Sequence, residues 1–197
     1  MAGIVLCASL ALPAAARAQQ AFEFDLSAFD PATAALLAQD VLLRAPDADI
    51  DRLFKAVHAA SRVDGDAAVV CALFEPDAER SPAALQRMAS RLSADSRQRF
   101  LDALAAVAVA GLQSPRQPYD AAAGLQVVKS AGVKAMFLNE GFAEGMAADG
   151  VDESSRRQRC QSMRWLVGAL EGFEPFERAA ATRYLMLEGL ALSAGEP

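Results

Sequence analysis

The chain has 197 residues, of which 53% are hydrophobic, and its formal net charge at pH 7 is −6. This length fits one domain, and the apolar content excludes an intrinsically disordered chain, which has too little apolar surface to offset the entropy of ordering. The negative charge argues against nucleic acid or an anionic membrane as the main partner, because both repel an acidic protein.

The first 18 residues are typical of a cleaved signal peptide. Residues 3–16 are almost wholly apolar, and Ala16, Arg17 and Ala18 match a small-x-small cleavage site. The alternative, a buried N-terminal helix, is weakened by Pro13. No later apolar run reaches the ~18–20 residues that span a bilayer. We therefore expect a periplasmic protein without a stable membrane anchor, with secretion into the medium as the alternative.

Residues 19–30 predict an extended N-terminal arm. Phe22, Phe24 and Leu26 occupy alternate positions, the spacing of an extended segment with one apolar face. We expect this face to pack on the helical body; the alternative is that a binding partner adds contacts there. The arm ends at Asp30, which with Pro31 forms a good helix start.

The remaining residues, 31–197, predict one helical domain. Their apolar residues recur at helical spacing, and no run of alternating β-branched residues predicts a sheet. Short connections favour antiparallel neighbours. Gly124 and Gly132 are expected to interrupt the helical stretch that begins at Asp120. The sequence thus predicts an all-α fold, a single-domain bundle of about seven to eight helices in antiparallel hairpins, with the segments 31–44, 49–62, 66–74, 94–110, 133–147 and 176–192 among them.

Three of these segments carry predictions about burial. Residues 103–110 have no polar side chain, which is typical of a helix buried on most sides, so we expect a central position. The basic cluster that follows Asp152 is interpreted as the solvated face of one helix; it comprises Arg156, Arg157, Arg159 and Arg164. In the last helix, one face is expected to form the inner stripe, consisting of Phe176, Ala180, Tyr184 and Leu187.

Cys71 and Cys160 are the two cysteines that remain once the signal peptide is removed. In an oxidising compartment an even pair favours a disulfide bond. The loop between them is long, so the chain-entropy model predicts ~4–5 kcal/mol of stabilisation. The alternative is two buried thiols that act as small apolar residues. Because both cysteines lie on core stripes of their helices, we do not expect a catalytic thiol.

His58 is the sole histidine of the chain. The local sequence supplies neither a nucleophile nor an orienting carboxylate for it, so we interpret it as a structural histidine. One histidine also excludes the usual multi-histidine zinc sites. Asp47, Asp49 and Asp51 have the spacing of a calcium-binding EF-hand loop, but Arg52 and His58 replace its glycine and its last glutamate. We expect neither a metal ion nor a cofactor.

The candidate binding surface comprises Glu140 and Glu144, with Gly141 and Gly145 beside them. In a helix the two carboxylates would lie one turn apart on one face, where they could bind a metal ion or serve acid–base catalysis. The glycines would allow a ligand or another backbone to come close. Two glycines cost a helix ~1 kcal/mol each, so a loop is the alternative. We add His58 to this candidate surface.

The sequence contains no nucleophile elbow, phosphate-binding glycine loop or Cys-x-x-Cys pair. We therefore assign no catalytic residue, and our leading hypothesis is an exported, non-catalytic protein-binding module of the inhibitor, immunity-protein or assembly-factor type. Charge complementarity favours a basic protein partner. The alternative is a small-ligand carrier or a hydrolase with a carboxylate-lined groove near Glu140, Glu144 and His58. A carrier would have a large dry cavity, whereas an inhibitor would have an exposed apolar patch.

Overall fold

The computed structural model describes residues 31–75, 78 and 82–194. Over these residues the chain forms helices and no β-strand, which confirms the all-α fold class. The predicted signal peptide (1–18) and N-terminal arm (19–30) lie outside the described residues. In chain order the elements are α1 (Pro31–Arg44), α2 (Asp47–Ser61), α3 (Asp64–Cys71), the 3-10 helix η2 (Ala72–Phe74), α4 (Pro82–Arg91), α5 (Ala94–Gln113), α6 (Ala121–Leu138), α7 (Phe142–Ala147), α8 (Glu153–Leu170) and α9 (Pro175–Ala194).

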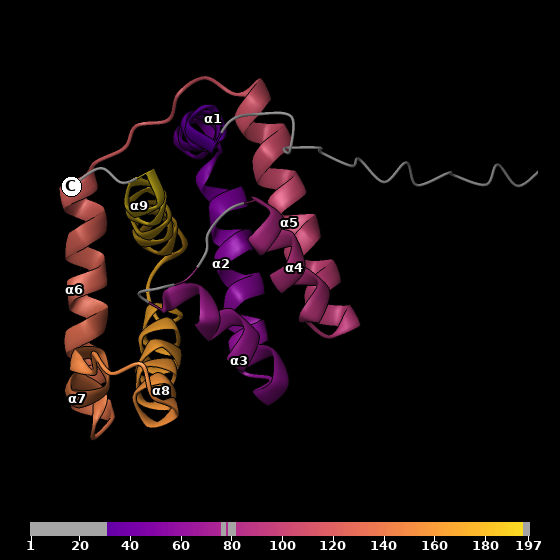
Figure 1. Ribbon diagram of the computed structural model, residues 1–197. Helices are drawn as coiled ribbons and strands as arrows, with labels where there is room; N and C mark the ends of the chain where they lie inside the picture. Colours follow the sequence, from indigo (N-terminus) through magenta and orange to yellow (C-terminus); the bar gives the residue numbers. More distant parts are fainter. Residues whose placement is uncertain (1–30, 76–77, 79–81, 195–197) are drawn as a thin grey trace, which may run out of the picture.

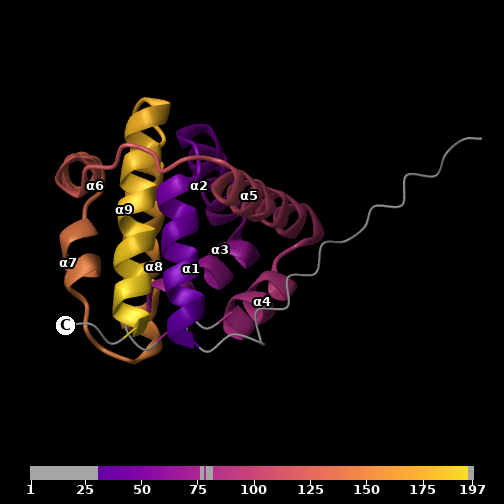
Figure 2. The same cartoon turned by 90° about the horizontal axis from the view of Figure 1, so that it is seen from above.

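The helices stand in columns that follow one another across the molecule (Figure 1). α6 and α7 form one outer column, and α8 and α9 form the next. α2 and α3 come after these, and α4 and α5 form the opposite outer column. A view from above shows the same order, with α9 between α6 and α1 (Figure 2). α2 packs on both α5 and α9, and α6 packs on both α8 and α9, so several of the main contacts join helices that are not consecutive in the chain.

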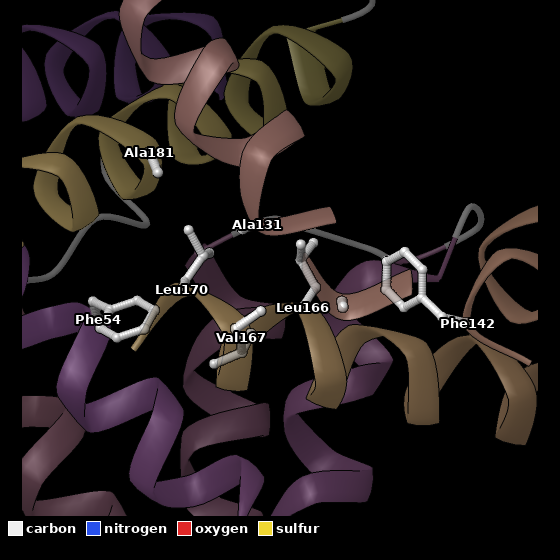
Figure 3. Packing of buried hydrophobic residues seen from close by; sticks show 9 residues of the cluster. Phe54, Ala131, Phe142, Leu166, Val167, Leu170 and Ala181 are labelled. Atoms are coloured by element: carbon white, nitrogen blue, oxygen red, sulfur yellow. The ribbon is translucent and has the colours of Figure 1, made fainter. Parts of the chain in front are cut away.

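The core consists of three apolar clusters that lie between these columns. The first joins α2, α6, α7, α8 and α9, and Figure 3 shows its members Phe54, Phe142, Leu166, Val167 and Leu170 together with small alanine side chains. The second lies between α1, α2, α5 and α9, and the third lies under α3 and α4. The alanines let neighbouring helices approach one another closely, since their side chains fill little of the space between the backbones.

α6 is continuous from Ala121 to Leu138, so the predicted interruptions at Gly124 and Gly132 and the predicted helix at 133–147 are wrong. Gly124 is buried where α6 meets α9, and a Cβ atom there would lie 2.8 Å from the carbonyl oxygen of Ala180. It is therefore a close-packing residue rather than a helix breaker. The chain breaks instead at 139–141, where Gly141 adopts a φ of 84° before α7 begins.

α5 is not central, although its second half lacks polar side chains. It lies in an outer column (Figures 1 and 2) and buries one face, which includes Ala103 and Val107. Leu101, Val109 and Leu112 are exposed on the helix. The prediction that α5 is buried on most sides is therefore wrong, because no neighbouring described helix covers its outer face.

The inner face of α9 differs from the predicted stripe. Phe176 is 63% exposed. The buried residues of α9 are instead Arg178, Ala179, Ala181 and Arg183. Arg183 donates to the carbonyl oxygens of Leu42 and Ala45 at 2.9 and 2.7 Å, and to Asp47 at 2.9 Å. Leu42 lies in the last turn of α1 and Ala45 directly follows the helix, so neither carbonyl accepts a hydrogen bond within α1. The two arginines can be buried because the chain supplies acceptors for their N–H groups.

The predicted disulfide bond is present. Cys71, at the end of α3, is bonded to Cys160 on α8, with 5.1 Å between their Cα atoms and a sequence separation of 89 residues. Next to this bond, Arg159 donates to the carbonyl oxygens of Ala148 and Gly150 and pairs with Glu75. Arg159 is thus turned inward, and the interpretation of the whole basic cluster as one solvated face is wrong for this residue.

Candidate functional site

The two carboxylates of the candidate surface do not share a helix. Glu140 lies in the turn between α6 and α7, and Glu144 lies in the first turn of α7. Both side chains are exposed. Gly145 is buried against α8, where a Cβ atom would overlap the hydroxyl of Ser162 and lie 2.6 Å from the carbonyl oxygen of Gln158. This glycine therefore permits the close approach of α8 rather than of a ligand.

Beside these glutamates lies a cluster of exposed apolar side chains. We call it the α6–α7 apolar surface and define it by Val133, Met136, Phe137 and Leu138 on α6 together with Met146 on α7. Val133, Met136 and Phe137 have the spacing that places side chains on one helix face. Phe137 is 86% exposed and Leu138 is 69% exposed. α6 uses its other face, which includes Ala131 and Ala135, for the core.

His58 lies away from these residues. It is on α2, and α8 stands between α2 and α7 (Figure 1). The structure therefore does not bring His58 together with Glu140 and Glu144. His58 instead lines an open groove of about 460 Å³, which we call the α2–α8 groove; its lining residues are His58, Ser61, Arg62, Gln161, Arg164, Trp165 and Gly168. The groove is lined by arginines, whereas the sequence suggested carboxylates.

The surroundings of His58 fit a neutral, structural imidazole. Burial lowers the pKa of His58 below its usual 6.5 and outweighs the opposite effect of Glu171, whose carboxylate oxygen lies 3.6 Å from Nδ1. Its ring stacks on Phe54 with 5.9 Å between the centroids. Ser61 is the hydroxyl-bearing residue that lines the groove, and its hydroxyl donates to the carbonyl oxygen of His58 at 2.7 Å. That hydroxyl is therefore not directed at the imidazole as a nucleophile would be.

The sequence did not single out Arg62, Trp165 or Gly168 of the groove. A signal for them exists in the helical spacing: one stripe of α2 and one stripe of α8 line the groove at intervals of three and four residues. Only the packing of α2 beside α8 shows that these two stripes face one another.

Within the part of the chain that the structure describes, no three histidine, cysteine, aspartate or glutamate side chains are grouped so that they could hold a metal ion. The described helices also include none with the length and apolar content needed to cross a membrane. Comparison of the chain with protein-family models, with curated protein sequences and with solved structures finds no match.

Proposed function

We propose that this chain is a non-catalytic protein-binding module and that the α6–α7 apolar surface is its contact surface. The observation that carries the proposal is the exposure of Phe137, together with the apolar residues one helical turn away from it. Full burial of a phenylalanine side chain contributes roughly 1.5–3 kcal/mol. A cluster of apolar side chains left in water is characteristic of a surface that another molecule covers.

The residue types of this surface suit a protein partner. Aromatic residues and methionine are enriched in protein interfaces, and a few aromatic anchors supply most of the binding energy. Phe137 is such an anchor, and Met136 and Met146 have flexible side chains that adapt to the shape of a partner. A small ligand would need a concave pocket, whereas these side chains extend from an outer helix.

The partner that fits this surface has an apolar face flanked by basic side chains. Glu140 and Glu144 are exposed at the end of α6 and in α7, next to the apolar residues. The chain as a whole has a net charge of −6. Opposite charges at the rim of an interface increase the association rate and orient the two proteins.

The compartment that we propose for this interaction is the bacterial periplasm. The disulfide bond between Cys71 and Cys160 supports it, because such bonds persist in oxidising compartments. The signal-peptide pattern in residues 1–18 points to the same compartment. Inhibitors, immunity proteins and assembly factors are protein-binding modules that fit a small exported chain without a catalytic constellation.

Two matched substitutions test this function. Phe137→Ala removes the anchor of the α6–α7 apolar surface, whereas Phe176→Ala removes an exposed phenylalanine at the start of α9. Each variant is used to capture proteins from the native envelope fraction, and the captured proteins are quantified by mass spectrometry. We expect a stoichiometric protein that is retained by the unsubstituted chain and by Phe176→Ala but lost, by tenfold or more, with Phe137→Ala.

Unfolding controls accompany this comparison. Because both side chains are exposed, both variants should unfold within roughly 0.5 kcal/mol of the unsubstituted chain. Equal retention of the captured protein by both variants would show that the α6–α7 apolar surface is not the contact surface. The absence of any stoichiometric protein would contradict the protein-binding function itself.

A further inference from the structure

Two arginines line the α2–α8 groove of this acidic protein. One wall comes from the end of α2 and from Arg62, which directly follows it; the other comes from α8 and includes Arg164. The net charge of the whole chain is −6, so the presence of two arginines in one groove contrasts with the overall composition. Arginine presents several N–H donors in a planar arrangement that matches the oxygens of carboxylate and phosphate groups.

The arginines of the groove remain accessible to a ligand. Arg62 is exposed. Arg164 lies 3.4 Å from a carboxylate oxygen of Asp64, whose side chain is 95% exposed. An ion pair of this kind contributes little to stability because water screens it. A ligand that brings its own anionic group into the groove can therefore replace Asp64 as the partner of Arg164.

Trp165 supplies an aromatic surface next to these charges. It lies one residue after Arg164 and is only partly buried, with part of its side chain packed against the first core cluster. The remaining part lines the groove together with His58 and Gln161. An indole ring offers stacking contacts to another flat ring, and the amide of Gln161 offers both a hydrogen-bond donor and an acceptor.

Gly168 leaves open space in the groove. A Cβ atom at this position would meet no heavy atom within 4 Å. The volume of about 460 Å³ falls within the range that proteins use for small ligands, roughly 300–1,000 Å³. The space is therefore suited to a compact molecule with one ring.

We propose that the α2–α8 groove binds a small organic oxyanion that carries a flat ring, with its carboxylate or phosphate group held by Arg62 and Arg164 and its ring against Trp165. This binding site is separate from the α6–α7 apolar surface: α8 stands between α2, which contributes to the groove, and α6 and α7, which carry that surface (Figure 1). It does not depend on the proposed protein-binding function. The sequence suggested a carboxylate-lined groove near His58, whereas the charged residues that line this groove are Arg62 and Arg164.

Trp165 makes a direct test possible, because it is the only tryptophan of the chain. Its fluorescence therefore reports on this groove alone. The full chain is titrated with phenyl phosphate and with benzoate, which carry the two oxyanion types on the same ring. Phenol, which has the ring without the charge, and inorganic phosphate, which has the charge without the ring, are the comparison compounds.

We expect a saturable change in fluorescence with at least one of the two ring-bearing anions and a clearly weaker response to phenol and to inorganic phosphate. The stronger of the two anions identifies the oxyanion type. Arg62→Gln and Arg164→Gln should each weaken this binding by about tenfold, because each removes a charge-assisted hydrogen bond. Arg157→Gln is the matched control on α8: Arg157 is exposed and pairs with Glu153, so binding should be unchanged.

Gly168→Leu provides an independent arm of the test. The leucine side chain would extend into the open space and should abolish the response without lowering the helix content measured by circular dichroism. Gly168→Ala adds only a methyl group where nothing lies within 4 Å, and should retain binding. The proposal is overturned if neither anion gives a saturable response, if phenol binds as well as the anions, or if Arg157→Gln weakens binding as much as Arg62→Gln and Arg164→Gln.

Discussion

Arg178 on α9 and Asp51 on α2 form a two-bond ion pair inside the bundle. Nε of Arg178 donates to Oδ1 of Asp51 at 2.7 Å, and Nη2 donates to Oδ2 at 3.2 Å. The two side chains are only 8% and 7% exposed. Arg178 also donates to the carbonyl oxygens of Glu171 and Phe173 at the end of α8. One guanidinium therefore joins α2, α8 and α9.

Asp51→Asn should destabilise the protein strongly. The substitution removes the countercharge of Arg178 but leaves its guanidinium buried, and an uncompensated buried charge costs about 3–5 kcal/mol. The free energy of unfolding, measured by urea denaturation, should fall by this amount. Glu153→Gln is the control, because it breaks an exposed ion pair with Arg157 and should cost less than ~0.5 kcal/mol. Equal effects of the two substitutions would contradict this prediction.

The same ion pair should make stability depend on pH in the acid range. Burial alone would raise the pKa of Asp51, but the hydrogen bonds from Arg178 and Lys55 outweigh it and lower the pKa below 3.8. A carboxylate with a lowered folded-state pKa stabilises the fold above its unfolded pKa, and this contribution is lost as the pH falls through the folded pKa. The stability difference between the unsubstituted chain and Asp51→Asn should therefore be constant from pH ~7 to ~5 and smaller at pH ~3. A difference that grows on acidification would contradict the assignment.

Substitution of two glycines of α6 by alanine should change the stability of the protein in opposite directions. A Cβ atom at Gly124 would lie 2.8 Å from the carbonyl oxygen of Ala180 and 2.9 Å from Cβ of Tyr184. α6 and α9 would have to separate, so Gly124→Ala should destabilise by about 1–3 kcal/mol. At Gly132 nothing lies within 4 Å, and alanine should stabilise by up to about 1 kcal/mol through its helix propensity. Thermal unfolding of the two variants compares these effects directly.

Removal of the disulfide bond should lower the free energy of unfolding without unfolding the protein. The bond between Cys71 and Cys160 closes a loop with a sequence separation of 89 residues, for which the chain-entropy model gives about 4–5 kcal/mol. Urea denaturation of the double variant Cys71→Ala, Cys160→Ala should show a loss of this order. Added reductant should have no further effect on the variant, whereas it should destabilise the unsubstituted chain. Insensitivity of the unsubstituted chain to reductant would contradict the prediction.

Neutralising the two exposed glutamates should slow association with the protein partner. Glu140→Gln combined with Glu144→Gln removes two negative charges beside the α6–α7 apolar surface. Because charges at an interface rim act mainly on the association rate, this rate should fall while the melting temperature stays unchanged. The salt dependence of the rate should also weaken. An unchanged rate, measured by surface plasmon resonance with the captured partner, would show that the glutamates lie outside the interface.

The sequence alone determined the helical character of the chain and several of its boundaries. Helix starts are local features: the helical stretch expected to begin at Asp120 is α6, and the side chains of Asp120 and Asp152 accept hydrogen bonds from the first turns of α6 and α8. The pairing of Cys71 with Cys160 could also be predicted from the sequence, since only two cysteines follow the predicted signal peptide. These features depend on residues close in sequence or on a choice with few alternatives.

Only the tertiary structure decided which faces of the helices are buried and which residues gather around His58. Arg178 and Arg183 face the interior because the fold brings them hydrogen-bond acceptors from α1, α2 and the end of α8. The residue spacing within α9 does not indicate these partners. Phe137 is exposed because α6 has no neighbour on its outer side among the described helices, although its residue type alone favours burial. Burial is a property of pairs of helices, and the sequence of one helix does not specify its partner.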